Sequence, residues 1–228
     1  MPRIPVKLVT WDEIVRWSRG LAQKVLDAGY EPDIIVAVAR GGYVPARLLA
    51  DFLGVENMLS VQSQHWTEAA KASERALLKF PYKVDLSGYR ALLVDDIVDT
   101  GETVILARDF VASEWKPAEL KVAALQWIST VAKIKPDFYY MEVKEWVWFQ
   151  YPWTRLEDVT QFIKRMLAET AKEEGKTEWS LDEIRQGFRE WYGIDVEEFY
   201  YWDALTMLAR KGIVEVRDSR ILFKQKAS

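Results

Sequence analysis

The sequence predicts an α/β protein, in which a parallel sheet is flanked by helices and a small C-terminal helical, winged-helix-like domain follows. Two observations predict this fold class. Short apolar runs rich in β-branched residues alternate with amphipathic segments over the first two thirds of the chain, which is typical of a parallel sheet. Beyond them come three amphipathic segments and one hairpin pattern. We therefore expect two domains, residues 1–157 and 158–228.

The first elements are a helix and a buried strand. Thr10 can cap a helix that ends near Gly29. Residues 34–39 are too few and too β-branched for a helix, so they predict a strand buried on both faces. After it we expect a tight turn at 40–42, a helix over 43–52 and a strand over 59–63.

The rest of the predicted sheet follows a loop. Residues 64–83 are polar and mixed, which predicts a mobile loop with an extended end. Beyond it we expect strands over 91–94, 120–127 and 138–140, and a helix over 103–115.

The predicted C-terminal domain has three helices and a hairpin. Residues 158–175 form the first helix, and Ser180 with Glu183 makes a capping box that opens the second. Residues 196–211 form the third. The hairpin pairs residues 213–216 with 220–223.

Composition limits the classes of function. The chain has 228 residues, a net charge of -4 and no Cys, which excludes disulfides and thiolate metal sites. A weakly acidic chain is not typical of a general nucleic-acid binder. Neither a signal peptide nor an apolar run of ~18 residues is present, so we expect a cytoplasmic protein without membrane contact. The many charged and aromatic residues also fit a thermophilic, archaeal-like source.

The motif that carries the chemistry follows the strand predicted over 91–94. Two carboxylates, Asp95 and Asp96, stand at its C-terminal end, where ligands bind in open α/β sheets. The turn and helix start that follow can bind a phosphate through backbone N–H groups and hydroxyls. Asp95 and Asp96 suit ribose hydroxyls and a hydrated Mg2+. The turn consists of Asp99, Thr100, Gly101, Glu102 and Thr103.

This segment resembles the hallmark of the type I phosphoribosyltransferase family, and the resemblance covers about residues 8–157. It implies the fold of that family and an enzyme that joins the ribose phosphate of 5-phosphoribosyl-1-pyrophosphate to a purine base, with release of pyrophosphate. By the resemblance, Asp95 and Asp96 hold the ribose hydroxyls and, through water or ribose, Mg2+. Residues 99–103 wrap the 5-phosphate. The family is commonly dimeric, so a homodimer is expected.

A second element of the family follows the first buried strand. Ala39, Arg40, Gly41 and Gly42 stand where these enzymes bind pyrophosphate, and glycines allow the backbone to approach it closely. Arg40 can neutralise phosphate oxygens. The resemblance also implies that Asp99 handles the proton near purine N7. Arg40 and Asp99 are therefore the candidate catalytic residues.

A third element is aromatic. Residues 146–153 are similar to the base-binding loop of the 6-oxopurine branch, in which an aromatic residue before a Pro-Trp pair stacks on the purine. By that match Trp148 stacks on the base and Phe149 provides backbone contacts. The alternative is an aromatic core patch. Asp99 points to the same branch, because the adenine branch usually lacks a carboxylate there.

One departure affects the choice of base. The 6-oxopurine branch carries a Lys after its third strand that donates to the 6-oxygen, and here Ile128 stands about there. The missing donor favours adenine as substrate, giving AMP. The alternative is a hypoxanthine, guanine or xanthine enzyme, in which Lys133 could restore the donor.

A rival function is a transcription regulator that senses the same donor through a winged helix. Residues 158–228 hold 12 basic and 14 acidic residues, and the third predicted helix starts with Glu197 and Glu198. These carboxylates would repel phosphates. We therefore expect no nucleic-acid partner, and a C-terminal domain that packs on the first domain or on another subunit.

Overall fold

The computed structural model describes residues 3–66, 75–218 and 220–224. The chain divides into two compact units. We call Trp11–Trp146 the sheet unit, and Met1–Thr10 together with Val147–Ser228 the helical unit. The chain therefore passes from the helical unit into the sheet unit and back again. Residues 1–10 and 147–157, which we expected in the first domain, belong to the helical unit.

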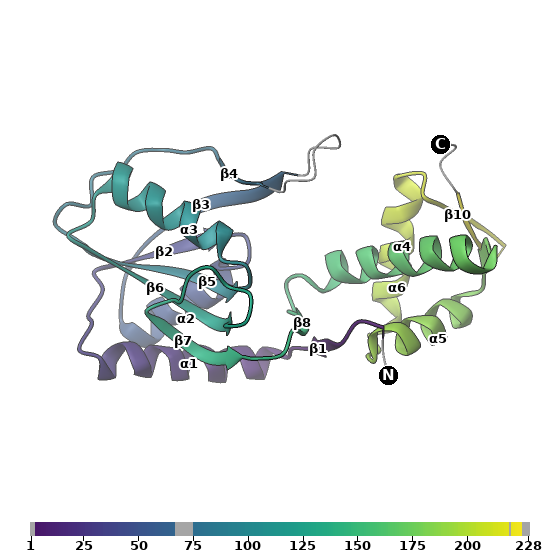
Figure 1. The fold of residues 1–228 in the computed structure, drawn as a ribbon, viewed down its shortest axis with the longest axis horizontal. Coiled ribbons are helices and arrows are strands. Elements are labelled where there is room, and N and C mark those ends of the chain that lie inside the picture. Colours follow the sequence, from purple (N-terminus) through teal and green to yellow (C-terminus); the bar gives the residue numbers. More distant parts are fainter. Residues whose placement is uncertain (1–2, 67–74, 219, 225–228) are drawn as a thin grey trace. The chain divides into compact units, whose positions relative to one another are not determined.

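The sheet unit is built on six strands in the order β4-β3-β2-β5-β6-β7. All neighbouring strands are parallel except β3 and β4, which are antiparallel. Helices α1 and α2 pack on one face and α3 on the other (Figure 1). This is the α/β fold with a helix-flanked sheet that the sequence predicted. The strands are β2 (Ile34–Ala39), β3 (Asn57–Trp66), β4 (Arg75–Lys79), β5 (Arg90–Val98), β6 (Glu119–Ile128) and β7 (Phe138–Val143).

Burial explains why these segments were recognisable. Every residue of β2 is buried, as its apolar run predicted. Helix α1 (Trp11–Asp27) buries an apolar face against the sheet, and α2 (Tyr43–Leu53) follows the turn after β2. Strand β5 is longer than predicted, because pairing with β6 continues past Asp95 to Val98.

Two predictions for the sheet unit need correction. The helix predicted over 103–115 is an α-helix, α3 (Glu102–Phe110), followed by one π-helical turn, η1 (Val111–Trp115). The predicted loop over 64–83 contains the end of β3 and all of β4, and residues 67–74 lie outside the described residues. Strand β4 was missed because its sequence, Arg-Ala-Leu-Leu-Lys, does not alternate between apolar and polar residues.

The helical unit contains α4 (Arg155–Glu174), α5 (Leu181–Tyr192) and α6 (Glu198–Arg210). The predicted capping box is confirmed, since the Glu183 N–H donates to Ser180 Oγ at 3.2 Å and the Ser180 N–H to Glu183 Oε2 at 2.6 Å. The predicted hairpin is also confirmed as β10 (Val214–Arg217) and β11 (Arg220–Phe223), which β9 (Glu178–Trp179) extends. Likeness to a winged helix stays a prediction.

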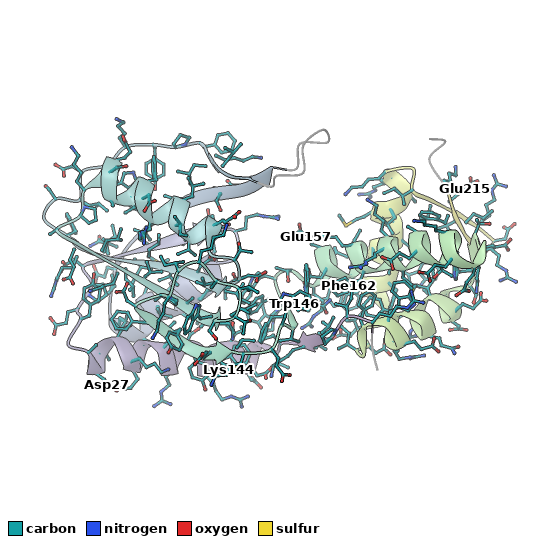
Figure 2. The ribbon with its side chains drawn as sticks, viewed as in Figure 1. Asp27, Lys144, Trp146, Glu157, Phe162 and Glu215 are labelled. Atoms are coloured by element: carbon teal, nitrogen blue, oxygen red, sulfur yellow. The ribbon has the colours of Figure 1, made fainter. Side chains whose placement is uncertain are left out.

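Aromatic side chains fill the core of the helical unit. Phe162 of α4, labelled in Figure 2, stacks on Tyr192 at 4.2 Å between ring centroids. Phe188 and Tyr201 complete this cluster and are fully buried. Among the described helices we find none with the length and apolar character that a bilayer crossing requires.

Besides β9, two other very short strands were not predicted from the sequence. Strand β1 (Val6–Leu8) pairs in parallel with β8 (Trp148–Gln150). Arg3 lies over the ring of Trp191 at 3.9 Å and pairs with Glu173 at 3.2 Å, which holds the N-terminal segment on the helical unit.

Candidate active site

The ends of β2 and β5 bring two predicted site elements together. The strands are parallel neighbours, with Ala37 opposite Val94, so the loops that follow them leave the same edge of the sheet. A Cβ added to Gly41 would lie 2.4 Å from Asp96 Oδ2. The turn after β2 and the acidic end of β5 therefore lie in contact.

The turn after β2 depends on its glycines. A Cβ at Gly42 would lie 2.4 Å from the Val94 carbonyl oxygen, so only glycine fits between the two strands. Its N–H donates to the Val38 carbonyl at 2.8 Å. The peptide bond between Ala39 and Arg40 is cis, Ala39 is buried and Arg40 is exposed.

The loop between β5 and α3 forms the second part of the site. Gly101 has a φ of +84° and precedes the first residue of α3, Glu102. Thr100 Oγ1 accepts a bond of 3.5 Å from the Glu102 N–H. Asp99 and Thr100 are exposed, and Thr103 lies in the first turn of the helix. The start of a helix presents backbone N–H groups, so this loop can bind an anion.

Two adjacent carboxylates dominate the electrostatics of the site. Asp95 and Asp96 are each 7% exposed. Burial, and next the charge of Asp96, raise the pKa of Asp95 well above its ordinary value, although the carboxylate accepts a bond from the Asp96 N–H at 2.9 Å. Hydroxyl donors or a cation would relieve this repulsion.

Mg2+ is a cation that fits these residues. Within the described residues no cluster of three or more acidic, His or Cys side chains could hold a metal ion on its own. Mg2+ commonly keeps several waters and needs only one or two carboxylates besides substrate oxygens. Asp95 and Asp96 match that requirement.

The structure does not bring Trp148 and Phe149 into the sheet unit. Both belong to β8 of the helical unit, where the ring of Trp148 packs edge-on against Phe162 at 5.5 Å. Phe149 is 7% exposed. The structure therefore shows the alternative that we named, in which these aromatic side chains pack in a core. Stacking of Trp148 on a base stays a prediction.

Sequence reasoning overlooked Gln150. The residue is fully buried beside Phe149, and within the described residues neither its amide nitrogen nor its amide oxygen has a hydrogen-bond partner. A buried amide without partners is costly unless a ligand or water satisfies it. The signal in the sequence was one polar residue inside an aromatic run.

The close approach of Gly41 to Asp96 gives a first prediction. Gly41→Ala should raise the KM for the predicted donor, 5-phosphoribosyl-1-pyrophosphate, about tenfold, because the methyl group displaces the Asp96 carboxylate. Steady-state kinetics measure the effect. Gly88→Ala is the matched control, since nothing lies within 4 Å of a Cβ at Gly88. Equal KM values for the two variants would contradict the contact.

Comparisons with known proteins agree with this geometry. Residues 7–157 match the family described as "Phosphoribosyl transferase domain". The xanthine-guanine phosphoribosyltransferase of Desulfotalea psychrophila is 30% identical over 147 residues, which cover 64% of this chain and 84% of that protein. The enzyme of the same name from Cereibacter sphaeroides is 33% identical over 153 residues, covering 64% and 84%.

Two solved structures are also similar to this chain. The structure of a purine phosphoribosyltransferase from Pyrococcus horikoshii is 28% identical, with a TM-score of 0.57 over 64% of this chain and 93% of that one. A protein from Neisseria gonorrhoeae solved with bound ppGpp is 25% identical, with a TM-score of 0.58 over 69% and 93%.

Proposed function

Because the chain belongs to the phosphoribosyl transferase domain family and is a purine phosphoribosyltransferase, we propose that its acceptor is a 6-oxopurine: guanine, xanthine or hypoxanthine. The observation that carries the proposal is the set of curated relatives at 30–33% identity, which are named xanthine-guanine phosphoribosyltransferases. The structural relative that holds ppGpp, a guanine nucleotide, supports the same class of base.

The adenine prediction is the weaker one. It depended on Ile128, which is buried at the end of β6 and offers no donor to a 6-oxygen. The relatives favour the alternative that we named, a 6-oxopurine enzyme. A group other than residue 128 would then donate a hydrogen bond to the 6-oxygen. The Lys133 ammonium lies 2.5 Å from Glu102 Oε1 and is already paired there.

The proposed reaction is a displacement at the anomeric carbon of the donor. A bond forms between that carbon and purine N9 while the bond to pyrophosphate breaks, and pyrophosphate leaves with the electron pair. Asp96 and Asp95 would accept hydrogen bonds from the ribose hydroxyls, and the loop 99–103 would hold the 5-phosphate. Arg40 and Gly41 would bind the leaving pyrophosphate.

Two further groups complete the proposal. Asp99 would take the proton that the purine loses, which is a general base role. Mg2+, held by the Asp95–Asp96 pair through water or ribose, would neutralise charge on the pyrophosphate. The base-binding roles that the resemblance implies for Trp148 and Phe149 remain predictions. The homodimer, the cytoplasmic location and the archaeal-like source remain predictions.

Competition between bases tests the proposed acceptor. With guanine, xanthine, hypoxanthine and adenine offered together with donor and Mg2+, the best 6-oxopurine should exceed adenine at least tenfold in kcat/KM, or about 1.4 kcal/mol. Chromatography of the nucleotides formed gives the ratio. A ratio in favour of adenine would restore the interpretation of Ile128. Donor binding without turnover of any base would instead support the regulator.

A further inference from the structure

Lys133 lies against the loop that precedes α3. After β6 ends at Ile128 the chain turns back, and the Lys133 N–H donates to the Thr100 carbonyl at 2.8 Å. The side-chain ammonium of Lys133 donates to Glu102 Oε1 at 2.5 Å. One residue therefore contacts both sides of Gly101, once through its backbone and once through its side chain.

The next residue closes the same contact. A Cβ at Gly101 would lie 2.7 Å from Ile134 Cγ2, so the returning segment packs directly on the loop. Ile134 and Ala132 pack against the buried core below α3. Residues 132–134 are thus anchored in the core, and they support the loop at Gly101, where φ is positive.

Glu102 creates an electrostatic problem within this loop. It is the first residue of α3, and the start of that helix is where a phosphate would bind. Its side chain is only 33% exposed, so solvent screens the carboxylate incompletely. An unpaired carboxylate at this place would repel the donor's phosphate.

We propose that Lys133 is a positioning residue for the phosphoribosyl donor: by pairing with Glu102 and bonding to Thr100, it neutralises the loop and holds it in its phosphate-binding form. The inference rests on the proposed function. It gives Lys133 a role at the donor in place of the base-reading role that the sequence suggested.

Lys135 provides a matched control. It lies two residues further along the same segment, and its ammonium stands over the rings of Trp127 at 5.3 Å and Tyr139 at 5.6 Å. None of its described contacts involves the loop.

A double-mutant cycle tests the proposal. Lys133→Met should raise the KM for 5-phosphoribosyl-1-pyrophosphate about tenfold and change kcat by less than about twofold, whereas Lys133→Arg should restore most of the loss. In a Glu102→Gln background the same Lys133→Met change should have less than about a twofold effect, because no carboxylate is left to neutralise. Lys135→Met should leave both constants unchanged.

Several results would overturn the inference. An equal effect of Lys133→Met in both backgrounds would mean that the ammonium contacts the substrate directly. A change in the KM for the purine, with the KM for the donor unchanged, would indicate that Lys133 contacts the base. Calorimetric titration with the donor distinguishes failure of the inference about Lys133 from failure of the proposed function. If the wild-type protein binds no donor, both fall, and if wild-type and Lys133→Met proteins bind it equally, only the inference falls.

Discussion

Replacing Asp95 and Asp96 together with Asn is expected to lower kcat/KM about ten-thousandfold. Each carboxylate would accept hydrogen bonds from a ribose hydroxyl, and losing about 3 kcal/mol of transition-state stabilisation costs about a hundredfold. Asn keeps the size of the side chain and an acceptor oxygen but removes the charge. Release of pyrophosphate, followed in a coupled assay at saturating Mg2+, measures the loss.

The ligand-free protein provides the control for this variant. Burial and the charge of Asp96 raise the pKa of Asp95, so the folded state binds this proton more tightly than the unfolded state does. The free energy of unfolding should therefore rise as pH falls through the raised pKa towards the ordinary value of 3.8. Burial and the charge of Asp96 make the ionised form of Asp95 unfavourable in the folded protein, so the double variant should unfold at an equal or higher temperature.

Two outcomes would contradict this prediction. Near-normal turnover of the double variant would show that the donor binds elsewhere. A clearly lower unfolding temperature would show that the two carboxylates hold the fold together, and the loss of turnover would then say nothing about the reaction.

Asp99→Asn is expected to lower kcat about a hundredfold or more, while the affinity for the donor changes by less than about threefold. Asp99 follows the last residue of β5 and its side chain is exposed, so the loop should tolerate an amide of the same size. An amide cannot take the proton that the purine loses. Single-turnover rates and calorimetric dissociation constants for the donor measure the two effects separately.

Asp109→Asn is a suitable control for this change. Asp109 is an exposed carboxylate of α3 that pairs with Arg108 at 2.7 Å, away from the loop. Its replacement should leave kcat unchanged. If Asp99→Asn weakened donor binding and left the rate intact, Asp99 would shape the phosphate loop only.

Much of the sheet unit could be predicted because its strands are buried. A strand covered on both faces, such as Ile34–Ala39, must be apolar throughout, and this pattern is visible without any tertiary information. The candidate site was predicted by the same logic, since residues 39–42 and 95–103 lie at or just after the C-terminal ends of such strands. Their adjacency depended on β2 and β5 being neighbours, which a resemblance could suggest and the contact of Gly41 with Asp96 confirms.

Other features depended on contacts between distant residues. Strands β1 and β8 have three residues each, which is too few to show any periodicity. They are strands only because they pair with each other, with Val6 opposite Trp148. The position of Lys133 depended on how the chain turns after β6. Likewise the aromatic residues of 146–153 could either pack in a hydrophobic core or bind a ligand, and the sequence alone could not decide between these two roles.

The pairing of β1 with β8 has a consequence for dissecting the protein. The helical unit is discontinuous in sequence, whereas the sheet unit is one uninterrupted stretch, Trp11–Trp146. A truncation after residue 157 would leave Ile4, Val6 and Trp148 without the core that they pack against, and exposed apolar surface of this kind promotes aggregation. Expressing the sheet unit alone therefore requires two cuts. Because the first and last residues that the structure describes, 3 and 224, belong to the helical unit, a circular permutant that links the two ends of the chain and opens it after Trp146 would make the helical unit continuous in sequence.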